Sequence, residues 1–280
     1  MELLTYTYDQ MTSEDKHILA RDIREPTVIR GLYQPVAMKV KFEEMIKLFG
    51  NTELPVEIYD ISDMVTTDAE LGKSTVHSLL DHWKKNKKPS LYCAEVDLFT
   101  QNIPEIRKGI LLETLRNPNT SMREVGELML YLGNDHGSGL HLHVNSDFIL
   151  NQLYGSKTVY IFNNYDNPNI HKNSVFSISK SNFAKEDFFK MDHSKMKVYK
   201  VTLQPGDSLL IPPWSWHATQ GHGINMSITQ VFDRKNISYL LKNPNLIMDY
   251  FIDDYTMVLM ILLTIVFLIL FIRRQYHHTR

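Results

Sequence analysis

Short apolar runs separated by turn-forming residues dominate the chain from about residue 127 onward. Runs of this length, bounded by Gly, Pro, Asn or Asp, are typical of β-strands. We expect strands at 128–132, 140–144, 148–153, 158–162, 198–203, 208–211 and 226–232. Gly155-Ser156 and the stretch 204–207 supply turns between them. Several short strands in succession predict a sandwich or a barrel, such as a jelly roll.

The first hundred residues mix helical and strand-like patterns. Ser13 and Ser74 stand where the N-cap of a helix is expected. We expect helices at 13–23, 42–49 and 74–85, and strands at 27–31 and 54–59. The predicted fold class is therefore mostly β with flanking helices (α+β). Residues 1–120 form a helix and strand portion that packs on a barrel formed by residues 121–240.

One stretch near the C-terminus is longer and more apolar than any of these strands. Residues 255–272 contain no charged side chain. As a helix they would span about 27 Å, close to the hydrocarbon core of a bilayer at about 30 Å. A buried or dimerisation helix normally carries a polar stripe, which this stretch lacks. We therefore expect a transmembrane helix at 255–272, followed by a short basic tail at 273–280.

The orientation of this helix is inferred from its flanks. Residues 1–6 lack the basic and apolar regions of a signal peptide. The tail after the helix is short, which favours a tail-anchored, single-pass membrane protein with its large domain in the cytosol. Arg273 and Arg274 favour the opposite orientation by the positive-inside rule, but basic residues ahead of the helix balance their number.

The overall charge limits the class of partner. The chain has 30 basic and 32 acidic side chains and a net charge of −2, so no global basic field attracts nucleic acid. The single cysteine, Cys93, excludes an internal disulfide and suits a reducing compartment. The 12 histidines are many for 280 residues, which directs attention to the spacing of metal ligands.

Two histidine motifs have a spacing that suits metal ligands. His141 and His143 lie in a strand-like run, where alternate side chains share a face, so both point the same way. The stretch 205–217 combines a tight turn, a strand, two prolines and aromatic residues before His217. A barrel can place His217 beside the first pair, which predicts a metal centre with three protein ligands and open positions. Asp147 shares their face if the strand continues, and is a possible extra ligand.

These motifs resemble those of the small JmjC-type, cupin-like hydroxylases related to the asparaginyl hydroxylase that acts on hypoxia-inducible factor. The resemblance covers about residues 24–235, and in the first half it rests on 25–31, 91–95 and 103–105. In the second half, Ser138-Gly139-Leu140-His141-Leu142-His143 is similar to the family's T-x-x-H-x-D, and Gly155-Ser156-Lys157 to its G-x-K. The fold that the resemblance implies is a double-stranded β-helix.

The resemblance also implies a metal, Fe(II), and a cosubstrate, 2-oxoglutarate. His141 and His217 match the two iron-binding histidines of the family. The positions that match its cosubstrate pocket are Lys157, Ser138, Tyr131 and Gln230. A buried ammonium is costly unless it meets an anion, and the distal carboxylate of 2-oxoglutarate is such an anion for Lys157.

His143 departs from the family pattern, because the family has a carboxylate at this position. A site of three histidines is chemically reasonable, since some non-haem iron dioxygenases of the cupin fold use one. It removes a negative charge, however, which affects the retention of Fe(II). One alternative is a register shift in which His143 and Asn145 take the two positions, and another is the recruitment of Asp147 as a fourth ligand.

Three functions are consistent with these features. The first is an Fe(II)- and 2-oxoglutarate-dependent oxygenase that hydroxylates a protein side chain and is tethered to a membrane. The second is a three-histidine dioxygenase that does not use 2-oxoglutarate, against which Lys157 argues. The third is a catalytically silent barrel that acts as a membrane-anchored binding module, which the histidine at position 143 keeps open.

Overall fold

A computed structural model describes residues 3–20, 23–33, 50–59, 70–85, 90–98, 126–143, 146–163, 170, 183–233 and 262–269. The chain divides into two compact units, Met1–Lys172 with Phe183–Arg234, and Asn173–Asn182 with Lys235–Arg280. The first unit holds all the described strands and the candidate site. The second unit holds the described helix 262–269.

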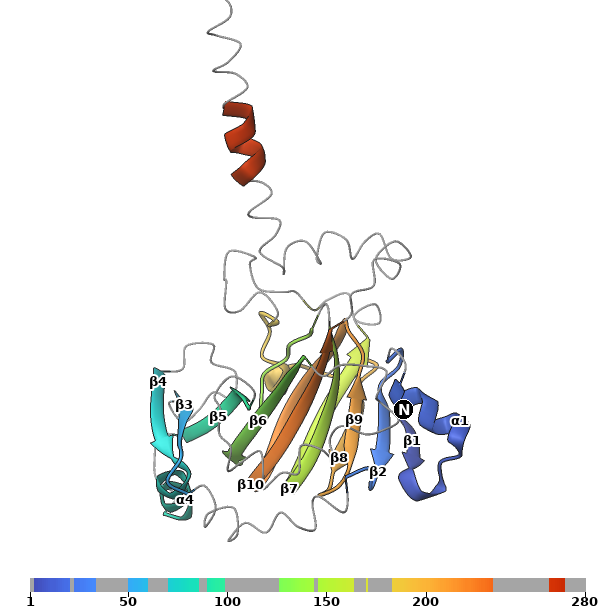
Figure 1. Cartoon of the computed structure of the whole chain (residues 1–280), viewed down its shortest axis with the longest axis horizontal. Coiled ribbons are helices and arrows are strands. Elements are labelled where there is room, and N and C mark those ends of the chain that lie inside the picture. The colour runs from blue at the N-terminus through green and yellow to red at the C-terminus, as the bar shows by residue number, and fades with distance from the viewer. Residues whose placement is uncertain are drawn as a thin grey trace, which may run out of the picture. The chain divides into compact units, whose positions relative to one another are not determined.

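The described strands of the first unit form one sheet, in the order β1-β2-β9-β7-β10-β6-β5-β3-β4, with β8 paired to β7 (Figure 1). Their bounds are β1 Leu4–Thr7, β2 Thr27–Arg30, β3 Glu53–Tyr59, β4 Glu70–Thr75, β5 Ser90–Asp97, β6 Glu127–Asn134, β7 Ser146–Asn163, β8 Tyr199–Leu203, β9 Ser208–Ile211 and β10 Ser215–Asp233. The helices are short: α1 Ser13–Lys16, α4 Val76–Lys84, and the 3₁₀ turns η1 Tyr8–Gln10, η2 His17–Ala20 and η5 Phe188–Lys190.

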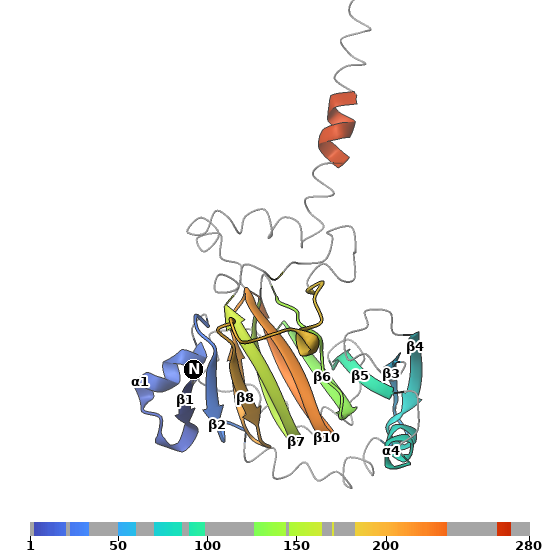
Figure 2. The same ribbon diagram turned by 180° about the vertical axis from the view of Figure 1, so that it is seen from behind.

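Two long strands, β7 and β10, run through two layers of the sheet. The first part of β7 pairs with β9 (Figure 1). Its second part pairs with β8, which lies beside it in Figure 2. The second part of β10 pairs with β6, and both parts pair with β7. This sharing of strands between layers makes the first unit a jelly roll, mostly β with few helices, as the apolar pattern predicts.

The bend in β7 occurs at Gly155. Its φ is 62°, in the left-handed region, and a Cβ there would lie 2.4 Å from the backbone oxygen of Ile224. The opposite strand, β10, carries its register shifts between His222 and Ser227. The sequence predicts a turn at Gly155 between two strands. That prediction is wrong, because the glycine lets one continuous strand change direction instead.

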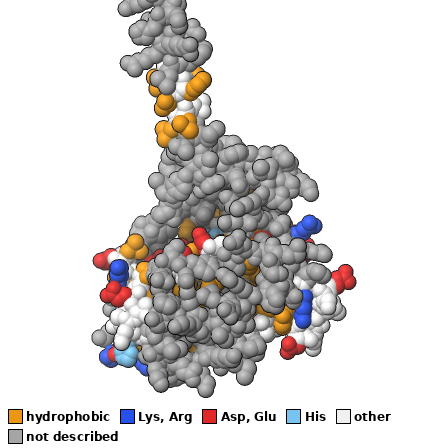
Figure 3. Space-filling view, viewed as in Figure 1, with side chains coloured by type: hydrophobic (Ala, Val, Ile, Leu, Met, Phe, Trp, Pro, Cys, Tyr) orange, Lys and Arg blue, Asp and Glu red, His pale blue; other side chains and the backbone are white. Residues whose placement is uncertain are grey.

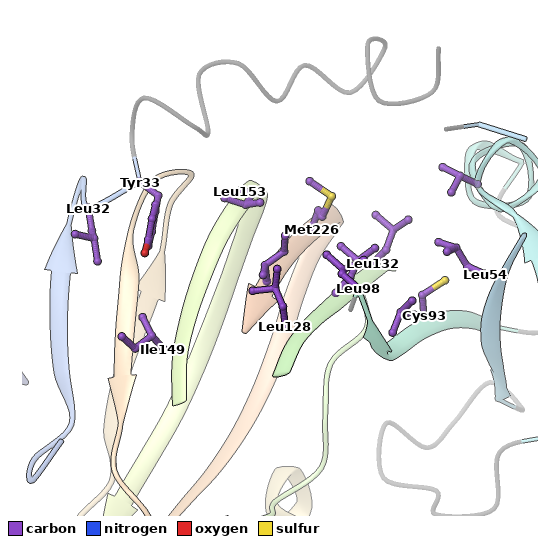
Figure 4. Close-up of a cluster of buried hydrophobic side chains, with 14 of the residues drawn as sticks. Leu32, Tyr33, Leu54, Cys93, Leu98, Leu128, Leu132, Ile149, Leu153 and Met226 are labelled. Carbon is purple, nitrogen blue, oxygen red and sulfur yellow. The ribbon is translucent and has the colours of Figure 1, made fainter. Parts of the chain in front are cut away.

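The two faces of the sheet bury separate apolar clusters. We call the first the interlayer cluster; it comprises Val28, Phe148, Leu150, Val159, Ile161, Val201, Leu203, Leu209, Ile211 and Val231. Both parts of β7 contribute to it, so it lies between the two layers. On the opposite face is the outer cluster, which includes Ile149, Leu153, Leu128, Leu132 and Met226 (Figure 4). Neighbouring residues of β7 alternate between these clusters, as the pleat of a strand requires.

Most of the predicted strands are present. The predictions at 27–31, 54–59, 128–132, 198–203 and 208–211 are confirmed as β2, β3, β6, β8 and β9. The strand predicted at 140–144 is wrong, because the described residues there make only isolated bridges from His141 to His217 and to Phe183. The strands β1 and β4 were not expected, since Leu4–Thr7 and Glu70–Thr75 have no buried residue and lack an apolar face.

The helix starts lie one residue away from the predicted caps. Thr12 and Asp15 form a reciprocal capping box, with N–H to oxygen distances of 2.9 and 3.1 Å. Thr75 caps α4, because its Oγ1 accepts from the N–H of Ser78 at 3.1 Å. The apolar face of α4 is buried in the outer cluster through Val76, Leu79, Leu80 and Trp83. The predicted helix at 42–49 lies outside the described residues.

The helix 262–269 is the only described part of the predicted transmembrane stretch. Its apolar side chains are exposed, from 46% for Ile265 to 69% for Phe267 (Figure 3). Among the residues that the structure describes, no helix combines the length and the apolarity needed to cross a membrane. The rest of 255–272 and the tail 273–280 lie outside the described residues.

Candidate metal centre

Three histidines meet at one point of the first unit. One ligand nitrogen from each of His141, His143 and His217 lies within 4.8 Å of those of the other two. The ring centroids of His141 and His217 are 4.1 Å apart, and each lies 5.1 Å from that of His143. Among the described residues no carboxylate or thiolate belongs to this group. The structure thus brings together the three histidines that the sequence predicts as metal ligands.

The backbone fixes two of these ligands opposite each other. His141 and His217 exchange backbone hydrogen bonds, with distances of 3.0 and 2.8 Å from nitrogen to oxygen. The carbonyl of His143 accepts from the N–H of Trp214 at 2.8 Å. Trp214 has a φ of 64°, a strained conformation for a bulky residue, at the corner that leads into β10. The corner and the bridge together hold the three histidines in one register.

Backbone carbonyls fix the tautomers of two rings. Nδ1 of His141 lies 2.8 Å from the oxygen of Gly139, and Nδ1 of His217 lies 3.0 Å from that of Ser215. Because a carbonyl only accepts, each Nδ1 carries the proton and donates it. Each Nε2 is therefore the basic nitrogen, which is the arrangement of metal-binding histidines with an outer partner.

The environment favours the neutral form of the three rings. Burial lowers the pKa of His141. Burial, together with the neighbouring histidines, lowers the pKa of His143 and His217 well below the usual range. Neutral imidazole is the form that binds a metal. The donor set therefore fits a divalent first-row metal such as Fe(II), and the chemistry of the ligands does not by itself select iron.

His143 packs differently from the other two rings. Its ring stacks on Phe148 of the interlayer cluster, with 3.7 Å between centroids and 22° between planes. Asp147, next to Phe148 in β7, is fully buried and lies by alternation on the opposite face of the strand. It is not a member of the histidine group, so its role as an extra ligand stays a prediction. Asn145 lies outside the described residues.

Phe183 covers His141 and was not singled out from the sequence. Its ring stacks on the His141 ring at 5.1 Å and 24°, and the N–H of Ala184 donates to the oxygen of Leu140 at 2.8 Å. The segment is anchored a few residues later by Phe188, which is fully buried and stacks on His193. A single Phe in a long connection carries no pattern that distinguishes it, so sequence reasoning had no signal for this contact.

Lys157 is a buried cation on the same pair of strands as His217. It is 2% exposed, its Nζ donates to Oγ of Ser227 at 2.5 Å, and it lies 5.5 Å from the centre of the Tyr131 ring. Burial lowers the pKa of the Lys157 ammonium to about 7. Within the described parts of the chain, no carboxylate forms an ion pair with it. Lys157 is thus buried beside Tyr131, and its role in binding an anionic cosubstrate stays a prediction.

Ser138 and Gln230 are placed differently from each other. Ser138 bonds through its N–H and its hydroxyl to Oγ1 of Thr219, at 2.9 and 3.0 Å. Thr219 was missed, although its position two residues after His217 in a strand was a usable signal. Gln230 instead bonds Tyr33 and Asn151, each at 3.2 Å.

The placement of Gln230 on β10 explains this difference. Ser227, which binds Lys157, lies three residues before Gln230, so the two side chains point to opposite faces of the strand. Gln230 lies beside Tyr33 of the outer cluster. Its predicted place among the cosubstrate-binding residues therefore has no support from its position.

The family assignment rests on comparison with known proteins. The pattern of the cupin-like domain family matches residues 20–238. Jumonji C domain-containing protein 5 of Drosophila melanogaster is 25% identical over 224 residues, which cover 73% of this chain and 54% of that protein. The match thus spans about half the length of this relative. With a jelly roll, a group of three histidines and a match over most of its length, the chain belongs to the cupin-like domain family.

Proposed function

We propose that the chain is an Fe(II)- and 2-oxoglutarate-dependent oxygenase that hydroxylates a protein side chain. The observation that carries the proposal is the pairing of a three-histidine group with a buried lysine. His217 lies opposite Ile161, and Lys157, four residues before Ile161 on β7, has the same orientation in that strand. A dicarboxylate with a metal-chelating end and a distal carboxylate matches a metal site and a cation on one strand pair.

Each polar residue has a distinct part in this proposal. His141, His143 and His217 hold the metal through neutral nitrogens. Lys157 binds the distal carboxylate of 2-oxoglutarate. The bound anion raises the pKa of the ammonium, which burial lowers, and so keeps the lysine protonated. The hydroxyls of Ser138 and Thr219, already bonded to each other, are available to orient the cosubstrate. The ring of Tyr131 lies against the ammonium and limits the access of water to it.

When bound, the metal and the cosubstrate would supply the oxidising chemistry, in which O2 gives one oxygen atom to succinate, formed from 2-oxoglutarate with loss of carbon dioxide, and the other to the hydroxylated substrate. The chain contributes orientation and exclusion of water. Phe148 of the interlayer cluster contacts His143 directly, so the site borders this apolar cluster. A dry site strengthens the charge interactions of Lys157 and of a bound metal.

The proposal includes a membrane tether at residues 255–272, with the large domain in the cytosol and the basic tail 273–280 on the other side. Support comes from the uncharged sequence of this stretch and from the exposed apolar side chains of 262–269. Helices exposing apolar side chains all around are stable in a bilayer and unfavourable in water. The tether restricts substrates to proteins at or near that membrane.

A catalytically silent barrel that binds a partner is the second candidate, and His143 is the observation that favours it. To distinguish the two, the full chain is loaded with Fe(II) without oxygen, then exposed to oxygen with 2-oxoglutarate, and succinate is measured. The proposal predicts metal-dependent succinate and weaker 2-oxoglutarate binding in Lys157→Ala. Cosubstrate binding without succinate would favour the silent barrel. Oxygen consumption without succinate, at the same rate in wild type and Lys157→Ala, would favour a dioxygenase that does not use 2-oxoglutarate.

A further inference from the structure

We infer that His143 makes metal retention conditional on a bound anion, so that the metal and a 2-oxo acid enter this site cooperatively. The inference rests on the metal site of the proposed function and adds a rule for its occupancy. It follows from the charges that the described residues bring to the site, taken one by one.

The donor set carries no negative charge. As metal ligands His141, His143 and His217 are neutral imidazoles, so a divalent ion bound by them keeps its full charge of about +2. A carboxylate in place of His143 would cancel one of these charges. Holding an uncompensated dication in an apolar environment is costly, and the cost falls on metal affinity.

Among the residues that the structure describes, no carboxylate joins the histidine group. The ring of His143 instead stacks on Phe148, an apolar side chain of the interlayer cluster. Asp147 is directed to the opposite face of β7 by the alternation of the strand. Lys157 shares this strand pair and brings no negative charge in either of its protonation states. The described residues that face the metal position therefore supply no charge that compensates the metal.

An anionic ligand compensates both the charge of the metal and that of the Lys157 ammonium. A 2-oxo acid brings a carboxylate to the metal, and 2-oxoglutarate brings a second carboxylate to Lys157. Because each ligand lowers the cost of the other, metal binding strengthens anion binding by the same factor as the reverse. The metal occupancy of this site therefore depends on the concentration of the 2-oxo acid. In a site with one carboxylate ligand this dependence is weaker.

The experiment measures the affinity of the full chain for Mn(II) by electron paramagnetic resonance in chloride-free buffer, without anion, with pyruvate, and with 2-oxoglutarate. Pyruvate chelates like 2-oxoglutarate but lacks the distal carboxylate, so it isolates the charge at the metal from that at Lys157. Wild type is compared with His143→Asp, which adds the missing charge, and with His143→Asn, a neutral residue of the same size as Asp. Thermal unfolding checks that each variant is folded.

We expect pyruvate to increase the Mn(II) affinity of wild type at least about tenfold more than that of His143→Asp. His143→Asn follows wild type in this ratio, although its affinity for the metal is lower overall. An equal increase in wild type and His143→Asp overturns the inference. So does a wild-type affinity for Mn(II) that pyruvate leaves unchanged, a result that needs no variant.

Succinate formation by the Fe(II)-loaded wild type is measured in parallel, so that the two proposals fail separately. Succinate without cooperative binding overturns the inference and leaves the oxygenase proposal standing. Cooperative binding without succinate supports the inference and contradicts the oxygenase proposal. The absence of any Mn(II) binding, with or without anion, contradicts both.

Discussion

His141 and His217 face each other across a two-residue antiparallel bridge, each donating its backbone N–H to the carbonyl of the other at 3.0 and 2.8 Å. Their ring centroids lie 4.1 Å apart. A metal centre built on such a bridge depends on backbone geometry as much as on the side chains, because any shift between the two segments separates the ligands. The contacts that hold these segments therefore control metal affinity.

Phe183 is such a contact, since its ring stacks on His141. We expect Phe183→Ala to lower the affinity for Mn(II) about tenfold, because loss of an outer partner of a ligand typically weakens metal binding 10- to 100-fold. Phe189→Ala is the matched control: its ring packs on Tyr160 and Phe188 and does not contact a histidine of the site. Equal effects of the two substitutions on Mn(II) affinity would show that Phe183 acts only through general stability.

Lys157 makes stability depend on pH. Burial lowers the pKa of its ammonium from 10.5 to about 7, so between these values the unfolded chain holds a proton that the folded chain has released. The cost of burying the charge is therefore fully present below about pH 7 and is relieved as the pH rises toward 10.5. Lys157→Met, which has no titrating group, lacks this contribution.

Urea unfolding at pH 7 and pH 9.5 measures the effect. The free energy of unfolding of wild type should rise with pH by roughly 2–3 kcal/mol relative to Lys157→Met. Lys200→Met, at an exposed lysine of β8, serves as the control and should retain the wild-type slope. The same slope in wild type and Lys157→Met would contradict the burial of a titrating ammonium.

Gly155 and Gly223 offer a direct comparison of strain with steric clash. Both have a left-handed backbone, with φ of 62° and 61°, but a Cβ at Gly155 meets the Ile224 oxygen at 2.4 Å and one at Gly223 meets nothing within 4 Å. Gly223→Ala should cost about 1 kcal/mol of unfolding free energy from strain alone. Gly155→Ala should cost at least about 1–2 kcal/mol more. Equal losses would mean that β7 and β10 can separate at the bend.

The membrane tether is tested by flotation of the full chain with phospholipid vesicles at high salt. We expect the wild type to float and a double variant, Leu263→Arg with Phe267→Arg, to remain in the dense fraction, since each arginine costs about 2.5–3.5 kcal/mol near the centre of a span. The control exchanges the two residues, Leu263→Phe with Phe267→Leu, and keeps the stretch apolar. Flotation of the arginine variant would contradict a span at 255–272.

The sequence predicts those parts of the fold that depend on local pattern. The strands β2, β3, β6, β8 and β9 were found because their buried residues are apolar and bounded by turns. The strands β1 and β4 escaped detection because they are held by pairing to β2 and β3 rather than by an apolar face. The bend at Gly155 was mistaken for a turn, since both uses of glycine look alike in one sequence.

In the candidate site, too, the residues with a local signal were predicted and those that depend on distant contacts were not. The three histidines and Lys157 carry their chemistry in the side chain, so spacing and family resemblance led to them. The predicted strand at 140–144 was wrong, yet His141 and His143 still converge with His217, because the bridge to β10 orients the segment. Phe183 and Thr219 act through contacts with distant parts of the chain, which one sequence does not show. Gln230 bonds Tyr33 and Asn151, and its role in cosubstrate binding stays a prediction.

The most direct test of the metal centre is X-ray absorption at the iron edge, on the full chain loaded with Fe(II) and 2-oxoglutarate without oxygen. Outer scattering from imidazole rings counts the histidine ligands. The arrangement of His141, His143 and His217 predicts three imidazoles in wild type and two in His143→Asn. His222→Ala, which alters a histidine of β10 bonded to Thr158, should keep all three. Two imidazoles in wild type, unchanged in His143→Asn, would contradict a three-histidine metal centre.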